Sequence, residues 1–265
     1  QVESTQIKQR LDLALSRADR AVAASCFCAA VRRAMDACDH PAMLYVDCVS
    51  SLGSMDFRMD EWGVDLAVSG SQKGFMLPAG LAIVGFSDKA IKASDTATLP
   101  RTFFDIRDMQ KGYDANAFPY TPPVGLMNGL KLSLEMLLDE GIDNVIARHT
   151  RIAEGVRLAV KAWGLELCAA SPDVYSDSVS AIRTPEGFDA NQIVARAASE
   201  YDMAFGIGLG EVAGKVFRIG HLGMLSDALM LSGLATAEMV MVDLGLDIKL
   251  GSGVAAAQEF YRHGS

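Results

Sequence analysis

The sequence lacks the features that mark membrane, secreted and nucleic-acid-binding proteins. No apolar run approaches the roughly 20 residues that a bilayer span requires, and the polar start QVESTQIKQRLD contains no apolar signal-peptide core. Basic residues are not in excess, since 24 Lys and Arg stand against 33 Asp and Glu and give a net charge of −9. We therefore expect a soluble, cytoplasmic protein whose main partner is neither a membrane nor a nucleic acid.

Metal-ligand patterns are also missing. The five cysteines include no CxxC pair, and the four histidines are too scattered along the sequence to indicate a ligand set. We expect no metal site, and we expect reduced, buried, structural thiols in a reducing compartment. The residues concerned are Cys26, Cys28, Cys38, Cys48 and Cys168, and His40, His149, His221 and His263.

One stretch, GIGLGEVAGK (206–215), has the glycine content of a nucleotide-binding loop but not its spacing. Leu209 stands where a P-loop has its first glycine, and Val216 stands where it has Ser or Thr. The glycines also lack the preceding long strand and the later acid of a dinucleotide fingerprint. We interpret the stretch as a flexible loop near the active site and not as a phosphate cradle.

What the 265 residues do contain is an alternation of strand and helix patterns, without internal repeats. The alternation before residue 140 predicts an α/β domain with a mainly parallel sheet, and the mixed pattern after it predicts a smaller α+β domain. We place these domains at 29–143 and 144–265 and leave 1–28 as an unplaced N-terminal segment. Strands are predicted over 43–46, 64–68, 80–86, 165–170, 177–184 and 215–220, and helices over 29–37, 87–94, 124–139, 144–163, 191–200, 227–246 and 254–261. Late in the chain, Met224, Met230, Met239 and Met241 are expected in the core.

Two polar residues follow neighbouring predicted strands. Asp47 comes directly after the apolar run Met43–Val46, and Lys73 follows Val64–Val68 in the polar loop SGSQKG. Ligands gather at the carboxyl ends of strands in open α/β sheets. A lysine amine can form a Schiff base with the aldehyde of pyridoxal phosphate, and a carboxylate can keep the pyridine nitrogen of this cofactor protonated. The alternatives are a loop-capping acid and a solvated loop lysine, which is the usual state of lysine.

A third candidate is Arg218, at the end of the apolar strand in KVFRIGHLG. An arginine in this position suits bidentate binding of a carboxylate, because its planar guanidinium presents two parallel donors. A structural salt bridge is the alternative interpretation.

Four segments together resemble the class V aminotransferases of fold type I. They are VDCVSSLG, DEWGVDLAVSGSQKGFMLPAGLAIVGFSDKA, FPYTPPVGLMNGL and GKVFRIGHLG, in this order. The resemblance covers residues 29–265, and it is greatest to the alanine-, serine- and aspartate–glyoxylate aminotransferases. It implies pyridoxal 5'-phosphate as the cofactor, transfer of an amino group from serine, alanine or aspartate to glyoxylate to give glycine, and a homodimer with the active sites at the interface.

The resemblance also implies roles for individual residues. Lys73 matches the Schiff-base lysine that moves the substrate proton, and Asp47 matches the carboxylate on the pyridine nitrogen. Val49 matches the small apolar residue beneath the ring, and Gln72 matches a phosphate contact. Thr121 matches a residue that reaches the phosphate bound to the neighbouring subunit.

Outside the cofactor contacts, Arg218 matches the arginine that binds the substrate α-carboxylate. Phe118 departs from the pattern, because some relatives have a tyrosine there that contacts the phosphate. Residues 1–28 do not align with the long region that precedes Ala29 in relatives and that supplies strands, a glycine-rich phosphate loop and a ring-stacking aromatic. We therefore expect a truncated or altered chain that by itself binds the cofactor weakly and is a poor catalyst.

Two alternatives to an active glyoxylate aminotransferase remain. A catalytically inactive remnant of such an enzyme would keep the fold without the missing cofactor contacts. A cysteine desulfurase of the same fold would need a reactive cysteine on a mobile loop and usually a histidine before the lysine, where this chain has Gln72. None of the matched motifs contacts the side chain of the amino donor, so the donor stays open among serine, alanine and aspartate.

Overall fold

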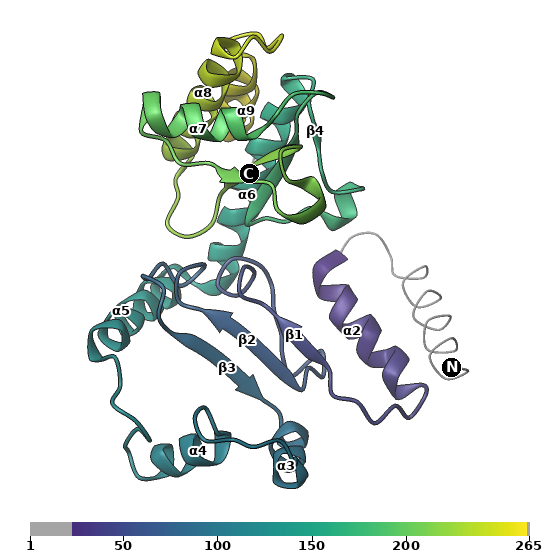
Figure 1. Ribbon diagram of the computed structural model, residues 1–265, viewed down its shortest axis with the longest axis vertical. Helices are drawn as coiled ribbons and strands as arrows, with labels where there is room; N and C mark the ends of the chain where they lie inside the picture. The colour runs from purple at the N-terminus through teal and green to yellow at the C-terminus, as the bar shows by residue number, and fades with distance from the viewer. Residues whose placement is uncertain (1–22, 264–265) are drawn as a thin grey trace. The chain divides into compact units, whose positions relative to one another are not determined.

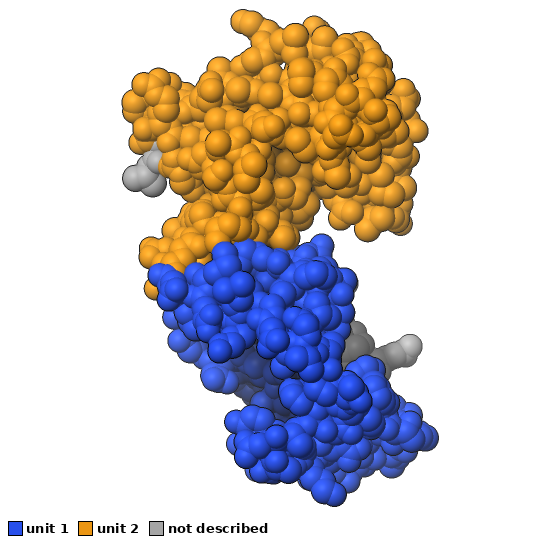
Figure 2. Space-filling view, turned by 90° about the vertical axis from the view of Figure 1, so that its left-hand side faces the viewer, with its two compact units in different colours: residues 1–52, 56–139 blue, residues 53–55, 140–265 orange. Residues whose placement is uncertain are grey.

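The computed structural model describes residues 23–263. They divide into two compact units, of which the first holds the chain up to Leu52 together with Asp56–Asp139, and the second holds Gly53–Met55 and everything from Glu140 on (Figure 2). Most of the predicted segment 1–28 lies outside the described residues. From Ala23, however, this segment is helical, because α2 spans Ala23–Asp36 and so begins six residues before the predicted helix.

The first unit is built on a three-stranded sheet in the order β1-β2-β3 (Figure 1). The strands are β1 (Tyr45–Asp47), β2 (Leu66–Gly70) and β3 (Ala82–Phe86), and the helices after them are α3 (Asp88–Thr96), α4 (Ile106–Asp114) and α5 (Val124–Glu140). β1 pairs with β2 in parallel, whereas β2 pairs with β3 antiparallel. The predicted α/β class is confirmed, and the sheet is mixed.

A buried carboxylate, that of Asp65, joins four segments of this unit. It accepts hydrogen bonds from the backbone N–H of Leu44 (2.8 Å) and from the hydroxyl of Ser87 (3.0 Å). Arg32 on α2 and Lys89 on α3 lie 3.5 and 3.6 Å from the same carboxylate. Because Asp65 immediately precedes β2, these contacts hold the approach to β1, the start of α3 and helix α2 against the central strand.

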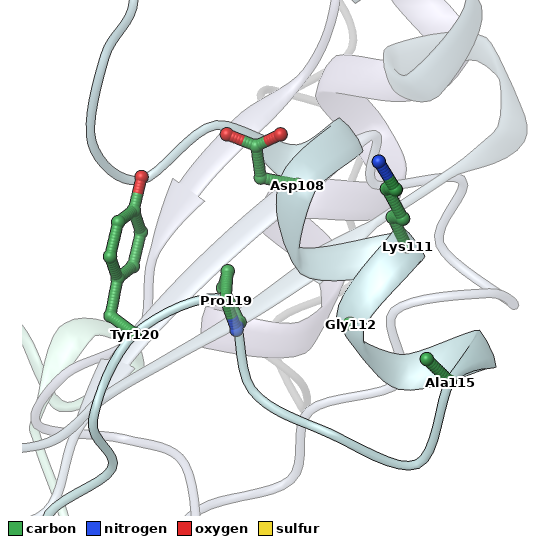
Figure 3. A pocket seen from close by; sticks show the side chains of 6 residues that line it. All are labelled: Asp108, Lys111, Gly112, Ala115, Pro119 and Tyr120. Carbon is green, nitrogen blue, oxygen red and sulfur yellow. The ribbon is translucent and has the colours of Figure 1, made fainter.

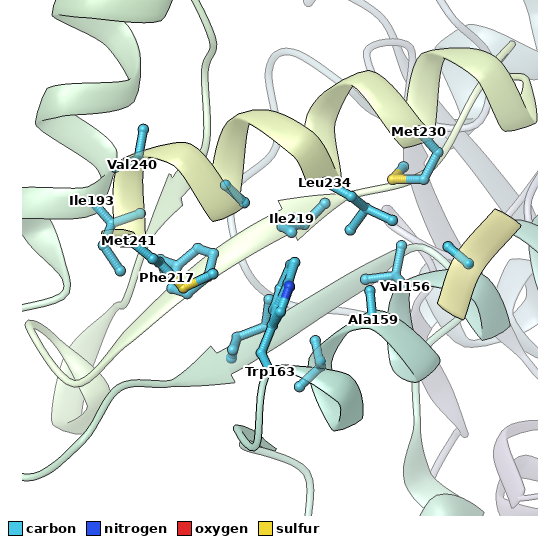
Figure 4. Packing of buried hydrophobic residues seen from close by; sticks show 14 of the residues in the cluster. Val156, Ala159, Trp163, Ile193, Phe217, Ile219, Met230, Leu234, Val240 and Met241 are labelled. Carbon is cyan, nitrogen blue, oxygen red and sulfur yellow. The ribbon is translucent and has the colours of Figure 1, made fainter. Parts of the chain in front are cut away.

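The second unit packs helices against a four-stranded sheet in the order β4-β5-β7-β6. Its strands are β4 (Glu166–Leu167), β5 (Val179–Arg183), β6 (Gly206–Ile207) and β7 (Val216–Gly220), and its helices are α6 (Ile142–Ala162), α7 (Asn191–Tyr201), α8 (Asp227–Asp243) and α9 (Ser252–His263). Short 3₁₀ turns lie at Pro172–Val174 and Gly210–Val212. The core between these elements contains Phe217 and Ile219 of β7 beside residues of α6 and α8 (Figure 4).

The predicted elements are all present, with bounds that differ by up to six residues, and one α-helix and one strand were missed along with the two short 3₁₀ turns. Helix α4 has no predicted counterpart, and β6 lies inside the stretch interpreted as a flexible loop. Among the methionines, Met230 and Met241 are buried in the core, but Met224 and Met239 are exposed, so that expectation was wrong for these two. In the part of the chain that the structure describes, no helix combines the length and the apolar character needed to cross a membrane.

The carboxylate of Glu238 organises the core of the second unit. It is 2% exposed and accepts hydrogen bonds from the Trp163 indole (2.8 Å) and from the backbone N–H groups of Gly251 (2.6 Å), Gly253 (2.6 Å) and Val254 (3.1 Å). Three of these donors lie at the start of α9, where helical N–H groups have no intrahelical acceptor. One side chain therefore caps α9 and anchors it to the end of α6.

We expect Glu238→Ala to lower the free energy of unfolding by about 3 kcal/mol or more, because it leaves several buried donors without an acceptor. Urea unfolding followed by far-ultraviolet circular dichroism measures this loss. The control is Glu259→Ala, since Glu259 is an exposed residue of α9 whose ion pair within residues 23–263 is with the exposed His263. Equal stabilities of the two variants would contradict the capping role.

Candidate functional site

The parallel pairing of β1 with β2 brings two strand ends to one edge of the sheet. Asp47, the last residue of β1, is opposite Val68 in the register, and β2 ends two residues later at Gly70. The loop that carries Lys73 begins at Ser71. Because both strands run in the same direction, Asp47 and this loop leave the sheet at the same carboxyl edge, where ligands bind in open α/β sheets.

The loop from Ser71 to Leu81 is closed by one buried serine. The hydroxyl of Ser71 donates to the Pro78 carbonyl (2.7 Å) and accepts from the Leu81 N–H (3.1 Å). The backbone of Ser71 adds bonds to Leu81 and Leu77. Lys73 is thus held in a short loop whose two ends are bonded to each other, so its amine starts from a fixed backbone.

Helix α5 supports the same loop from one side. The hydroxyl of Ser133 donates to the Phe75 carbonyl at 2.5 Å, inside the buried interior. Gly129 allows a close approach, since a Cβ there would lie 2.6 Å from a methyl carbon of Leu77. Helix and loop therefore form one packed body, and displacement of α5 would displace the Lys73 loop.

The two central groups are in different environments. Lys73 is half-buried, and within residues 23–263 its amine has no hydrogen-bond or ion-pair partner. Asp47 is exposed, and its Oδ1 accepts from the N–H of Val49 (3.0 Å), which leaves the second carboxylate oxygen available. Val49 itself is half-buried, in the turn that this bond fixes. An amine and a carboxylate oxygen at one sheet edge are thus free to bind a ligand.

The residues predicted to contact phosphate are both exposed. Gln72 folds back over β2, because a Cβ on Gly70 would lie 2.8 Å from the Gln72 carbonyl oxygen. Thr121 follows a segment in which the Tyr120 hydroxyl donates to the Thr102 carbonyl (2.9 Å). Beside this segment lies an open hollow of about 420 Å³ between α4 and the turn after it, lined by Asp108, Lys111, Gly112, Ala115, Pro119 and Tyr120 (Figure 3).

Arg218 belongs to the second unit. It lies on β7 between Phe217 and Ile219, which enter the core, so the pleat places Arg218 on the opposite face. Its Nε donates to the carbonyl of Ile207 (2.8 Å). No carboxylate of the described residues lies within ion-pair distance of its guanidinium, so the structural salt bridge considered above is absent from them.

Two buried histidines of this unit were not singled out by the sequence analysis. Nε2 of His149 accepts from the Gly223 N–H (3.0 Å), and Nε2 of His221 lies 3.0 Å from the Ser180 hydroxyl. The other ring nitrogens face carbonyls, so Nδ1 carries the proton in both rings. Together they fix the turn that follows β7. The only signal in the sequence was that His221 comes three residues after Arg218.

Two of the cysteines, Cys28 and Cys48, do not have the surroundings of reactive thiols. Cys48 is buried and donates to the Val68 carbonyl, and burial raises the pKa of its thiol and that of Cys28. A nucleophilic cysteine requires a lowered pKa. Cys28, Cys38 and Cys168 are only partly buried, so the expectation of buried thiols was wrong for these three. No group of three or more His, Cys, Asp or Glu side chains in residues 23–263 could hold a metal ion.

Comparison with known proteins identifies the family of this chain. Residues 28–195 match the family model described as Aminotransferase class-V. The chain belongs to the class V aminotransferase family. It is 75% identical over 234 residues to an L-aspartate–glyoxylate aminotransferase of Paracoccus denitrificans, and 57% identical over 235 residues to a serine–glyoxylate aminotransferase of Hyphomicrobium methylovorum. Each match covers 88% of this chain but 59% and 58% of the relative, so the chain spans about three fifths of their length.

Solved structures of the family confirm the fold. Pyridoxamine–pyruvate aminotransferase from Mesorhizobium loti superposes with a TM-score of 0.83 at 33% identity, over 90% of this chain and 61% of that one. Ureidoglycine–glyoxylate aminotransferase from Bacillus subtilis gives a TM-score of 0.82 at 24% identity, over 88% and 61%, which supports the fold alone. The expected resemblance to the fold type I class V enzymes is thereby confirmed.

Class V membership implies pyridoxal phosphate, and the residues present fit one end of it. The unpartnered amine of Lys73 suits the cofactor aldehyde, and the available oxygen of Asp47 suits a protonated pyridine nitrogen. The phosphate end has fewer groups, since Gln72 and Thr121 are exposed neutral side chains. The chain thus fits the ring of the cofactor better than its phosphate.

We expect Ser71→Ala to loosen the Lys73 loop, because it removes the buried hydroxyl that donates to the Pro78 carbonyl and accepts from the Leu81 N–H. The free energy of unfolding should fall by about 1–3 kcal/mol, and backbone amides between Lys73 and Leu81 should exchange faster with solvent. Hydrogen exchange read by mass spectrometry measures the second effect. Thr96→Ala, at the exposed end of α3, is the control, and unchanged exchange in the Ser71 variant would oppose this account of the loop.

Protonation of His221 should weaken the fold in acid. Burial lowers its pKa from 6.5 to about 4, with a further lowering by Arg157, while the Asp177 carbonyl acts the other way. The neutral ring therefore stabilises the native state fully above pH 6.5. About 3 kcal/mol is lost as the pH falls towards 4. Urea unfolding between pH 7 and 4 should show a steeper loss for the native sequence than for His221→Asn. Equal slopes, or an NMR titration of the ring near its ordinary value, would contradict this.

Proposed function

We propose that this chain carries the ring-binding and substrate-carboxylate-binding groups of a pyridoxal-phosphate-dependent aminotransferase that transfers an amino group to glyoxylate. The observation that supports it best is the unpartnered amine of Lys73 at the sheet edge where Asp47 ends the neighbouring parallel strand. The glyoxylate aminotransferases of P. denitrificans and H. methylovorum, at 75% and 57% identity, support the reaction. The donor is proposed as aspartate, serine or alanine.

The cofactor, when bound, supplies an aldehyde carbon that accepts the amino group and a ring that withdraws electrons from the substrate α-carbon. The residues of the chain supply the rest. Lys73 holds the aldehyde end and moves a proton to or from the substrate α-carbon. Asp47 keeps the pyridine nitrogen protonated, and Val49 packs beneath the ring. Gln72 donates to the phosphate. The closed Ser71 loop fixes the starting point of the Lys73 side chain.

Arg218 is proposed to bind the substrate α-carboxylate. Its guanidinium has no acidic partner in residues 23–263, and four of its five N–H donors have no hydrogen-bond partner there. A charged donor group without an acid is the expected state of a receptor for an anionic substrate. The same group would bind the carboxylate of an amino acid and that of glyoxylate, which suits a reaction with two alternating substrates.

A homodimer with shared sites is proposed on the segment between α3 and α5. This segment exposes an unusual number of large apolar side chains, and the rings of Phe103 and Tyr120 lie 4.2 Å apart. Such surfaces commonly bind another chain. Thr121 follows directly and is proposed to reach the phosphate bound by the partner subunit, without the help of a tyrosine at Phe118. The exposed residues of this segment include Leu99, Phe103, Phe104, Tyr113 and Phe118.

A catalytically inactive remnant is the second candidate. It is favoured by the exposure of Asp47, Gln72 and Thr121, since a tight anion site has buried donors. Cysteine desulfurase activity is disfavoured, because burial raises the pKa of the Cys48 thiol. The chain alone is accordingly expected to bind pyridoxal phosphate weakly.

The test of the proposed function is covalent labelling at Lys73. The protein is incubated with pyridoxal phosphate, reduced with borohydride and digested, and peptides are mapped by mass spectrometry. We expect a pyridoxyl group on Lys73 at concentrations that leave exposed lysines unmodified, because under the proposed function the amine of Lys73 would be held beside the cofactor aldehyde. Asp47→Asn should reduce labelling about tenfold, the effect of losing one charge-assisted hydrogen bond.

Two controls make the result specific. Lys92→Ala removes an exposed lysine of α3 and should leave labelling at Lys73 unchanged. Lys73→Ala should abolish the selective label without creating another. Labelling spread evenly over exposed lysines, with none preferred at Lys73, would favour the inactive remnant.

A further inference from the structure

The glycine-rich stretch that fails as a nucleotide loop lies against Arg218. Its first two residues, Gly206 and Ile207, form β6, which pairs antiparallel with β7 and places Gly206 directly opposite Arg218. Directly opposed residues of an antiparallel pair project to the same face of the sheet. The side chain of Arg218 therefore passes over Gly206 on its way to the Ile207 carbonyl.

The absence of a side chain at 206 makes this path possible. A Cβ on Gly206 would lie 3.2 Å from both Cβ and Nε of Arg218, and 3.5 Å from one of its terminal nitrogens. The first two distances are tighter than ordinary van der Waals contacts, so alanine at 206 would require Arg218 to shift by a few tenths of an ångström. Gly206 is not in the left-handed region, so alanine can adopt its backbone conformation and the conflict is with Arg218 alone.

The hydrogen bond from Arg218 Nε to the Ile207 carbonyl determines which N–H groups of the guanidinium remain available to a ligand. It uses one edge donor, at 2.8 Å, and leaves the two terminal nitrogens without hydrogen bonds in the described residues. These two nitrogens form the pair of parallel donors that matches a carboxylate. A guanidinium fixed at Nε loses less rotational freedom when it binds than a freely moving one.

We propose that Gly206 and the Ile207 carbonyl are positioning groups that aim the terminal nitrogens of Arg218 at the substrate carboxylate. This inference rests on the proposed role of Arg218. The glycine spacing of the stretch 206–215 excluded a role in nucleotide binding. In this proposal its first two residues instead support Arg218, and the stretch contributes no phosphate contact.

The experiment compares Gly206→Ala and Gly206→Val with Gly220→Ala in the full chain. Gly220 is the matched control, since it ends the same strand as Arg218 and a Cβ there would meet nothing within 4 Å. The probe is glycolate, which has the carboxylate of glyoxylate without the reactive aldehyde. The readout is the NMR signal of the Arg218 Nε–H, assigned by its loss in Arg218→Lys, and followed for exchange with solvent and during glycolate titration.

We expect slow exchange of this Nε–H in the native sequence and in Gly220→Ala, and about tenfold faster exchange in Gly206→Ala, equal to the loss of about one hydrogen bond. Glycolate should bind about tenfold more weakly to Gly206→Ala and more weakly still to Gly206→Val, with no change in thermal unfolding beyond that of Gly220→Ala.

Each outcome decides a different claim. Unprotected Nε–H in the native sequence, or equal glycolate affinity in Gly206→Ala and the native sequence, overturns the positioning role while the proposed function stands. Absence of any glycolate effect on the native Arg218 signal overturns the proposed substrate role, and the positioning inference with it. The exchange measurement on the native sequence needs no variant. It therefore still tests the inference if a variant fails to fold.

Discussion

The parallel pairing of β1 with β2 is the constraint on which the candidate site depends. It sends the chain after Asp47 and the chain after Gly70 out of the same sheet edge. With an antiparallel pair, the carboxylate and the lysine loop would lie at opposite ends of the strands. The Asp65 carboxylate stabilises this pairing. Asp65 immediately precedes β2, and its carboxylate accepts a hydrogen bond from the N–H of Leu44, just before β1. A shift between the two strands would break that bond.

The antiparallel pairing of β3 with β2 also constrains the site, because it limits the loop that carries Lys73. Ser71 bonds across to Leu81, so the chain that leaves β2 returns at once to β3 and the loop between them cannot spread. Lysine has four rotatable bonds, and only a fixed backbone makes the position of its amine useful to a ligand. The contacts from Ser133 and Gly129 of α5 restrict the position of this loop, as the hydrogen bond to the Ile207 carbonyl restricts the side chain of Arg218.

Much of this could be predicted from the sequence because the signals were local. Apolar runs that end before Asp47 and before the loop of Lys73 predicted the two parallel strands at positions close to those observed. Periodic leucines gave α5. The missed helix α4 carried a local signal, because Ile106, Met109 and Tyr113 have helical spacing, but none of its nine residues is buried. Strand β6 has two residues, one of them glycine, and exists only because β7 lies beside it. The roles of Gly206, His149 and His221 depend on partners 12 to 74 residues away, which no local pattern contains.

The candidate site residues differ in how far they are buried and held by neighbouring groups. Groups that must be fixed before a ligand arrives, the Ser71 hydroxyl and the strand of Arg218, are bound inside the described residues. Groups that would face the phosphate, Gln72 and Thr121, stand at the surface. An anion at the surface is screened by water and salt, whereas a buried one gains from each donor. Under the proposed function, affinity for the cofactor phosphate would therefore come from further donors that enclose it, while the residues described would orient the ring and the substrate carboxylate.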